Sequence, residues 1–270
     1  MDVQEAKLRA TATYNAAAEL FDDPRLSFWD RFGRRTVERL DLAPGSSVLD
    51  LCCGAGASAL PAAERVGPFG RVLGIDLAEN LVQRARVKAS IRRLGNLELR
   101  VEDLEQVELP PGSFDAVVCV FGLFLLPDMA EALRRMWGWV RPGGQLAVTT
   151  WGPRLFQPAD GLFWEAVRAE RPDLHRAAHP RDQIADPEAL RRLFEESGIP
   201  DVEIEAEAGF HPTPDPEDWW TVVMGSGYRG TVEALDPESR ARVRARTLRS
   251  FAATGARRIE TNVIYAVAAK

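Results

Sequence analysis

Apolar side chains recur at near-helical intervals along the first forty residues of the chain. Residues 6–21 carry apolar groups, and Pro24 opens a second segment in which Phe28 and Phe32 repeat the spacing. Such spacing collects the apolar groups on one face of a helix. The pattern predicts two N-terminal helices within residues 1–43, which precede the main fold.

After Pro44-Gly45 the pattern changes to short apolar or β-branched runs that alternate with helical stretches. This alternation is typical of βαβ units and a mostly parallel sheet. Two later runs, Val202–Glu207 and Thr261–Val267, are expected to extend the sheet at one edge. The predicted fold is α/β, a doubly wound three-layer αβα sandwich on a seven-strand sheet whose first five strands are Ser47–Leu51, Arg71–Asp76, Leu97–Val101, Phe114–Phe121 and Gln145–Thr150.

Start and stop signals place helices between these strands. One helix is expected over Ala78–Leu94. Another is expected over Met129–Val140, because Asp128 and Glu131 form a capping box. The run Pro142-Gly143-Gly144 is expected to stop this second helix.

Two inserted helices are expected later in the chain. Asp215-Pro216 and Asp236-Pro237 each place a capping acid before a first-turn proline. The strands and helices predicted above place the α/β core at residues 44–152. Residues 153–270 are expected to add helical substrate or lid insertions and the last two strands to the same domain. The aromatic residues of this last part suit either a lid or an ordinary core.

Residues that carry chemistry follow the first three strands. Gly54 and Gly56 lie between a strand and a helix, and residues without a Cβ let a ligand approach the backbone. Asp76 ends the second strand, where a carboxylate can accept hydrogen bonds from ribose hydroxyls. Glu102-Asp103 follows the third strand and is expected to face the same crevice. Each feature alone also suits a tight turn or a cap, but together they predict a nucleoside ligand.

These residues belong to a longer stretch, Val48 to Thr150, that resembles class I S-adenosylmethionine-dependent methyltransferases. It is especially similar to the branch of ubiquinone and menaquinone biosynthesis C-methyltransferases. The resemblance rests on the Asp50-to-Gly56 turn, Asp76, the Glu102-Asp103 turn, Phe114–Val118, and Leu133–Met136 running into Val140–Gly144.

The resemblance implies S-adenosylmethionine as the cofactor, with S-adenosylhomocysteine as its product. Gly54 and Gly56 would approach the methionyl part, Asp76 would hold the ribose, and Asp103 with the Leu104 backbone would read the adenine. Tyr14 would close over the cofactor, although an aromatic residue in a helical stripe also suits a core. The implied cofactor residues are Tyr14, Asp50, Gly54, Ala55, Gly56, Asp76, Leu77, Asp103, Leu104 and Phe121.

The expected reaction is methyl transfer by in-line displacement to oxygen, carbon or nitrogen of a small apolar or aromatic acceptor. Proximity and alignment supply most of the rate, and no metal is expected. His211 is a candidate general base, with a surface or satisfied histidine as the alternative. A noncatalytic cofactor-binding or regulatory protein stays open. An NAD-dependent oxidoreductase is opposed by Asp50 in the strand and by the lack of a Tyr-x-x-x-Lys pair.

Composition and the length of the apolar runs disfavour two kinds of partner, nucleic acid and a membrane. A net charge of -6 and a pI near 5.3 disfavour binding to nucleic acid. The longest apolar run, Ala116–Leu126, falls short of the ~20 residues that a membrane span needs. The chain start shows no secretory signal, and the three cysteines suit neither a disulfide framework nor a zinc site. A cytoplasmic protein is expected, and a homodimer is left open.

Overall fold

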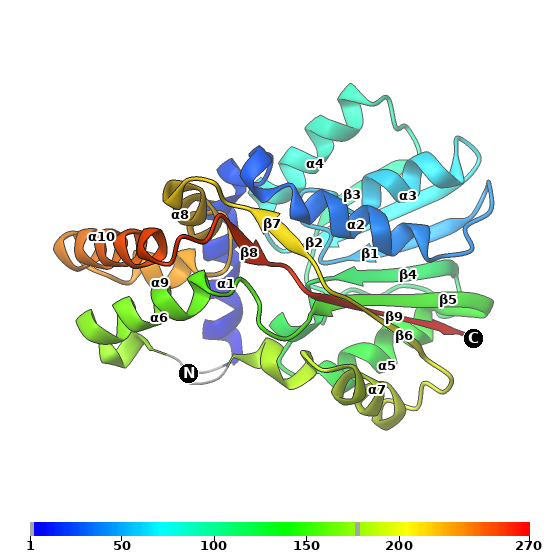
Figure 1. Ribbon diagram of the computed structural model, residues 1–270. Coiled ribbons are helices and arrows are strands. Elements are labelled where there is room, and N and C mark those ends of the chain that lie inside the picture. The colour runs from blue at the N-terminus through cyan, green and yellow to red at the C-terminus, as the bar shows by residue number, and fades with distance from the viewer. Residues whose placement is uncertain (1–2, 176–178) are drawn as a thin grey trace.

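The computed structural model describes residues 3–175 and 179–270. Its sheet has seven strands in the order β3-β2-β1-β4-β5-β9-β6, and β9 runs antiparallel to both of its neighbours (Figure 1). The predicted fold class is confirmed. The strands are β1 (Ser47–Leu51), β2 (Arg71–Asp76), β3 (Leu97–Val101), β4 (Phe114–Val120), β5 (Val140–Trp151), β6 (Glu203–Glu207) and β9 (Val263–Ala269).

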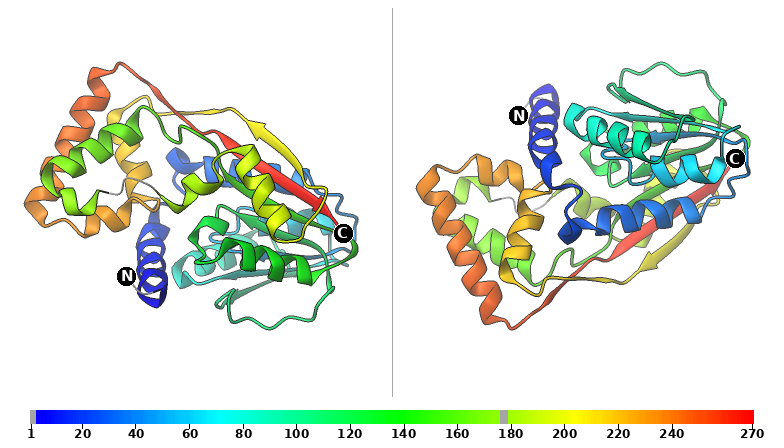
Figure 2. Two further views of the ribbon diagram at one scale, coloured as in Figure 1. Left: turned by 90° about the horizontal axis from the view of Figure 1, so that it is seen from below. Right: turned by 90° about the horizontal axis from the view of Figure 1, so that it is seen from above.

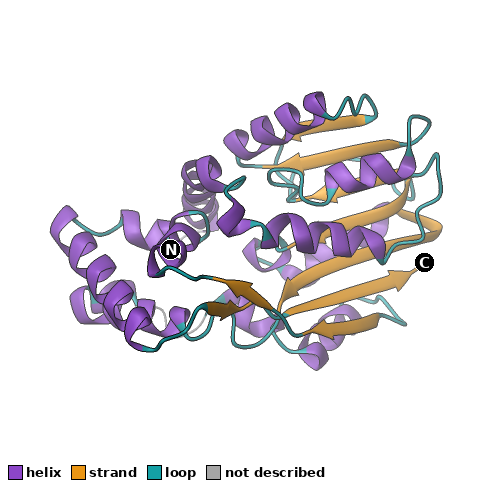
Figure 3. Ribbon diagram, turned by 45° about the horizontal axis from the view of Figure 1, so that its top comes forward, coloured by secondary structure: helices purple, strands orange, loops and turns teal. Residues whose placement is uncertain are grey.

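Helices cover both faces of this sheet (Figure 3). Buried side chains of three helices pack on one face of the sheet, and buried side chains of two other helices pack on the opposite face. Because both faces are covered, the central strands are almost continuously apolar rather than alternating. The helices are α2 (Phe28–Glu38), α3 (Ala59–Val66) and α4 (Glu79–Ile91) on one side, and α5 (Met129–Trp139) and α7 (Pro187–Glu196) on the other.

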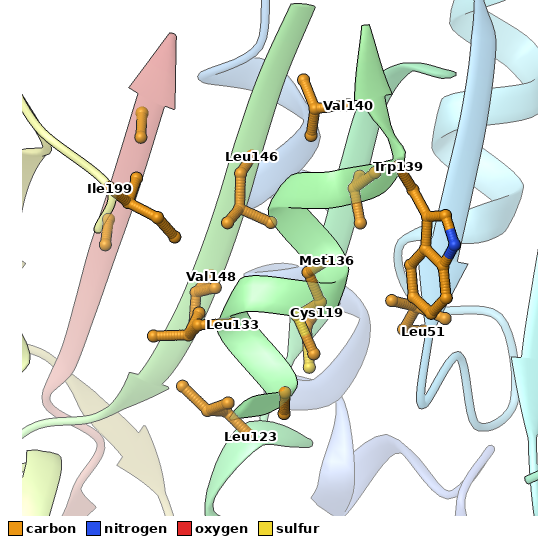
Figure 4. Close-up of a cluster of buried hydrophobic side chains, with 14 of the residues drawn as sticks. Leu51, Cys119, Leu123, Leu133, Met136, Trp139, Val140, Leu146, Val148 and Ile199 are labelled. Carbon is orange, nitrogen blue, oxygen red and sulfur yellow. The ribbon is translucent and has the colours of Figure 1, made fainter. Parts of the chain in front are cut away.

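The core under α5 illustrates how the apolar face of a helix fixes its place. Leu133 and Met136 lie beside Val148 of β5 and Cys119 of β4 (Figure 4). All four side chains are fully buried. Burying a large apolar side chain contributes roughly 1.5–3 kcal/mol, so this helix is anchored by its packing.

A second group of helices lies beyond one end of the sheet and contains α6 (Ala159–Glu170), α8 (Pro216–Met224), α9 (Arg229–Glu233) and α10 (Pro237–Ala253) (Figure 1). As predicted, Asp215 and Asp236 cap two of them through backbone N–H groups. The sequence did not predict α9 or the two-stranded sheet of β7 (Phe210–Pro212) and β8 (Arg258–Glu260). No described helix is long and apolar enough to cross a membrane.

Helix α1 (Val3–Ala17) packs against both α4 and α9, between the sheet domain and the second helix group (Figure 2). It therefore reaches both parts of the molecule. Short 3₁₀ helices complete the connections: η1 (Ala18–Leu20), η2 (Pro24–Leu26), η3 (Leu123–Leu125), η4 (Pro172–Leu174) and η5 (Pro180–Ile184).

The predicted start of the fifth strand at Gln145 is wrong, although the helix before it ends within one residue of its predicted end. The helix ends at Trp139, and β5 begins at the next residue, so Pro142-Gly143-Gly144 lies inside a strand. The register shifts here, since Val140 pairs with Phe114 but Gln145 pairs with Ala116. Proline and glycine are tolerated at such irregularities, where a ladder hydrogen bond is not required.

Candidate functional site

A turn after β1 places three residues in left-handed backbone conformation. Cys52, Gly54 and Gly56 have φ values of 56°, 50° and 85°. This region suits glycine, whereas at a cysteine it is strained, and such strain clusters at functional sites. The Gly56 N–H donates to the Cys53 carbonyl at 2.8 Å and closes the turn before α3.

The carboxylate of Asp76, at the end of β2, accepts hydrogen bonds from two backbone segments. One is the turn after β1, and the other follows Asp76 itself. One oxygen accepts the Gly54 N–H and the other accepts the Ala78 N–H, each at 2.8 Å. Burial raises the pKa of Asp76, and these N–H donors oppose that shift. Each carboxylate oxygen has two lone pairs, so both keep acceptor capacity for a ligand hydroxyl.

Asp50 supports the turn from within the protein. It is 1% exposed, and its Oδ2 accepts the Ser58 hydroxyl at 2.7 Å, which ties β1 to the start of α3. Burial raises the pKa of Asp50 to about 7. Desolvation thus makes the charged form of this carboxylate unfavourable.

An acidic rim follows β3 and is held by α1. The Lys7 ammonium lies 2.6 Å from Asp103 Oδ2 and also pairs with Glu105. The other Asp103 oxygen accepts the Glu105 N–H at 2.9 Å. Asp103 therefore has the turn-capping role that the sequence left open, and it also faces the space beside α1.

Several of these groups line a cavity that opens to solvent. Phe121 closes one side, directly after β4, with a φ of 55° and its ring stacked 4.0 Å from that of Trp151. Asp50 and Gly56 do not line the cavity but shape the turn beneath it. The predicted cofactor residues that do line it are Tyr14, Gly54, Ala55, Asp76, Leu77, Asp103, Leu104 and Phe121.

A second cavity, also open to solvent, adjoins the first. The two have part of their lining in common, so they lie next to each other along these shared residues. Aromatic side chains from β5, α6 and the segment before α9 make up much of the remaining surface. The shared residues are Ala10, Tyr14, Trp29, Phe124 and Leu125.

A polar cluster borders the second cavity. Asp160 Oδ1 accepts the Tyr228 hydroxyl at 2.5 Å and the Trp164 indole N–H at 3.2 Å. The Arg181 guanidinium is 3.5 Å from the same oxygen. Burial raises the pKa of Asp160 and raises the pKa of Tyr228 well above its ordinary value, so the Tyr228 hydroxyl stays protonated at neutral pH.

His211, the predicted general base, lines neither cavity. It is 4% exposed, its Nε2 lies 2.8 Å from the Arg25 carbonyl oxygen, and its ring is 5.1 Å from that of Phe28. Burial lowers the pKa of His211. These contacts give it the character of a satisfied core histidine, which was the alternative reading.

Comparison with known proteins identifies the family. A family model for a methyltransferase domain matches residues 48–144. Nocamycin O-methyltransferase of Saccharothrix syringae is 32% identical over 262 residues, covering 90% of this chain and 91% of that protein. This chain belongs to the class I S-adenosylmethionine-dependent methyltransferases. Its methyl donor is S-adenosylmethionine, and the oxidoreductase and noncatalytic alternatives are set aside.

The methyltransferase also resembles the branch expected from its sequence. Demethylmenaquinone methyltransferase of Listeria monocytogenes is 37% identical over 193 residues, covering 66% of this chain and 80% of that protein. A solved methyltransferase structure from Bacillus halodurans shares the fold, with a TM-score of 0.57 and 18% identity over 88% of this chain and 98% of that one.

The first cavity fits the chemistry of this cofactor. Asp30, Asp76, Glu102 and Asp103 line it together with Lys7, so its acidic groups outnumber its basic one among the described lining residues. S-adenosylmethionine carries a sulfonium charge and a ribose diol. Acidic side chains attract the first, and a buried carboxylate with free lone pairs can bind the second.

Sequence reasoning missed the polar cluster of the second cavity. Asp160, Arg181 and Tyr228 come from separate elements, and no spacing along the chain connects them. Phe156, Trp164 and Tyr228 belonged to the aromatic set that suited either a lid or a core, and all three line this cavity. Only the folded chain brings these groups together.

Proposed function

We propose that this methyltransferase methylates an oxygen of a small aromatic or polyketide-like acceptor bound in the second cavity. The observation that carries the proposal is the shared lining at Tyr14, Trp29 and Phe124, which joins an acidic cavity suited to the cofactor to an aromatic one. The name of the nocamycin O-methyltransferase, a relative over nearly the full length of the chain, supports oxygen as the methylated atom.

S-adenosylmethionine supplies a sulfonium methyl group that a nucleophile can attack in line. In this proposal, Asp76 holds the ribose hydroxyls, the Gly54 backbone meets the methionyl group, and Asp103 with Leu104 binds the adenine. The N-terminal helices within residues 1–43 and the helical insertions within residues 153–270 act as covers that exclude water from the two cavities. The rate then comes mainly from proximity and alignment of the two reactants.

Tyr14 of α1 lines both cavities, so it lies where the cofactor and the acceptor would meet. Burial raises its pKa to about 12, the negative charge of Asp76 adds to this shift, and the positive charge of Arg181 opposes it. The hydroxyl therefore stays protonated at neutral pH and acts as a hydrogen-bond donor rather than a base. We assign Tyr14 to closing over the cofactor and orienting the acceptor.

The two cavities can be tested separately by filling only the second one. Thr231 lines the second cavity and not the first, so Thr231→Trp should abolish methylation of aromatic hydroxyl compounds. Its affinity for S-adenosylhomocysteine should stay within about twofold of wild type, because cofactor contacts are unchanged. Methylation is followed with labelled S-adenosylmethionine, and cofactor affinity is measured by calorimetry.

Thr221→Trp is the matched control, because Thr221 is partly buried in α8 and lines neither cavity. It should retain methylation. Full activity of Thr231→Trp on the same acceptors would show that the acceptor binds elsewhere and would refute the proposal.

A further inference from the structure

The two adjoining cavities differ in the charge of their lining. The charged residues that line the first cavity are mainly acidic. Among the Asp, Glu, Lys and Arg residues described in the lining of the second, Arg9 and Arg181 are basic and Asp173 is acidic. The Asp173 carboxylate is already bonded to Arg171 at 2.6 Å. The second cavity is therefore aromatic, and the charges exposed on its described lining are mainly basic, although Asp160 and Asp182 lie behind Arg181. Such a lining favours an anionic occupant.

Arg181 is the buried member of this basic pair, with 17% of its side chain exposed. Its ion-pair distances are long, at 3.5 Å to Asp160 and 3.7 Å to Asp182. Charge-assisted hydrogen bonds between such groups are usually about 2.7–2.9 Å. Asp160 is instead bound closely by Tyr228, at 2.5 Å. The Arg181 guanidinium also hydrogen-bonds the Tyr228 side chain. With five N–H donors, this mostly buried group retains capacity for another anion.

The surroundings of Arg181 favour recognition of a planar anion. Tyr228 lies below the guanidinium, 5.8 Å from its carbon to the ring centre, and Trp164 joins the same cluster through Asp160. Aromatic surfaces beside a fixed guanidinium fork suit a ring that carries a carboxylate or an ionised hydroxyl.

We propose that Arg181 selects the acceptor by binding an anionic oxygen on it, and that Asp160 and Tyr228 hold Arg181 in place for this task. The inference rests on the proposed function, because it takes the second cavity as the acceptor site. Arg181 is thus a specificity-determining residue.

The test measures binding, by calorimetry, in the presence of S-adenosylhomocysteine. One pair of probes is 1-hydroxy-2-naphthoic acid and its amide, which differ in a carboxylate charge. A second pair is 2,4-dinitro-1-naphthol, ionised at neutral pH, and its methyl ether. The wild type should bind the anion of at least one pair about 10- to 100-fold more tightly than its neutral partner. The pair that shows the preference distinguishes a carboxylate from an ionised hydroxyl.

The preference should disappear in Arg181→Gln and survive in part in Arg181→Lys, which keeps the charge but not the fork. Arg168→Gln is the matched control, since Arg168 is exposed on α6 and lines neither cavity. It should behave as wild type. If Arg181→Gln does not fold, Arg181→Lys and the comparison within each probe pair still decide the question.

Several outcomes would overturn the proposal. Equal binding of anion and neutral partner by the wild type refutes the anion site and leaves the acceptor cavity intact. Equal loss of both partners in Arg181→Gln indicates a purely structural role. Weakened binding of S-adenosylhomocysteine assigns Arg181 to the cofactor instead. Failure of every probe to bind beside S-adenosylhomocysteine contradicts the proposed function itself, and with it this inference.

Discussion

Replacing Asp76 with alanine tests the proposed cofactor site most directly. The carboxylate binds the Gly54 and Ala78 N–H groups and retains lone pairs for the ribose. Hydrogen bonds to a charged group contribute roughly 1.5–3 kcal/mol each, but water enters the open cavity and offsets part of that loss. We expect Asp76→Ala to weaken cofactor binding by about 1–3 kcal/mol, or roughly 5- to 150-fold in Kd.

The same substitution also removes two acceptors from the backbone of the turn. Because water can reach both N–H groups from the cavity, the free energy of unfolding should fall by only about 1–2 kcal/mol. For a chain of this size that corresponds to a Tm lower by roughly 2–8 °C. The variant should thus stay folded at 25 °C, where the binding measurement is made.

Isothermal titration with S-adenosylhomocysteine is the assay, and circular dichroism verifies the fold. Glu102→Ala is the control, because Glu102 lines the same cavity and its side chain is 40% exposed. If general negative charge were responsible, both variants would lose affinity alike, whereas a screened surface charge should contribute at most about 1 kcal/mol. Unchanged affinity of folded Asp76→Ala would refute the assignment of Asp76 to the ribose.

Two further substitutions test the packing and the pH dependence. At Gly33 a Cβ would lie 2.4 Å from the Ala57 carbonyl, so Gly33→Ala should lower the free energy of unfolding by about 1–3 kcal/mol in a denaturant titration. Gly138 has open space around it, so Gly138→Ala should be neutral or slightly stabilising in the same titration. Burial lowers the pKa of His211, so the unfolded chain binds a proton first as the pH falls below about 6.5, and stability drops there. His211→Gln should therefore flatten the fall of Tm from about pH 7 to 5 and leave the pH profile of methyl transfer unchanged; an altered profile would restore His211 as a base.

The sheet and much of the first cavity were predictable because their signals are local. Continuous apolar runs mark strands covered on both faces, and parallel strands bring their carboxyl ends to one edge. Gly54, Asp76 and Asp103 lie at or just after the ends of three different strands, so predicting the strands was enough to predict that these residues meet. Their contacts with the cofactor remain predictions.

Long-range packing decided what the sequence could not show. Pro142-Gly143-Gly144 has the composition of a helix stop, yet it lies within β5, where the Gly143 N–H donates to the Lys270 carbonyl and the Lys270 N–H donates to the Gly144 carbonyl. His211 is polar and follows β6, but its partner is a backbone carbonyl of Arg25, 186 positions away. The cluster of Asp160, Arg181 and Tyr228 likewise depends on how α6, η5 and α9 assemble, which no periodicity encodes.

Helix α1 contributes Ala10 and Tyr14 to both cavities. A shift or tilt of this helix therefore alters both cavities together. Single substitutions are more selective, because Lys7 lines the first cavity alone and Arg9 lines the second alone. By contrast, α6 and α9 border only the second cavity, the proposed acceptor site. Redesign of this enzyme for new acceptors should therefore begin on those two helices, where changes leave retention of the methyl donor intact.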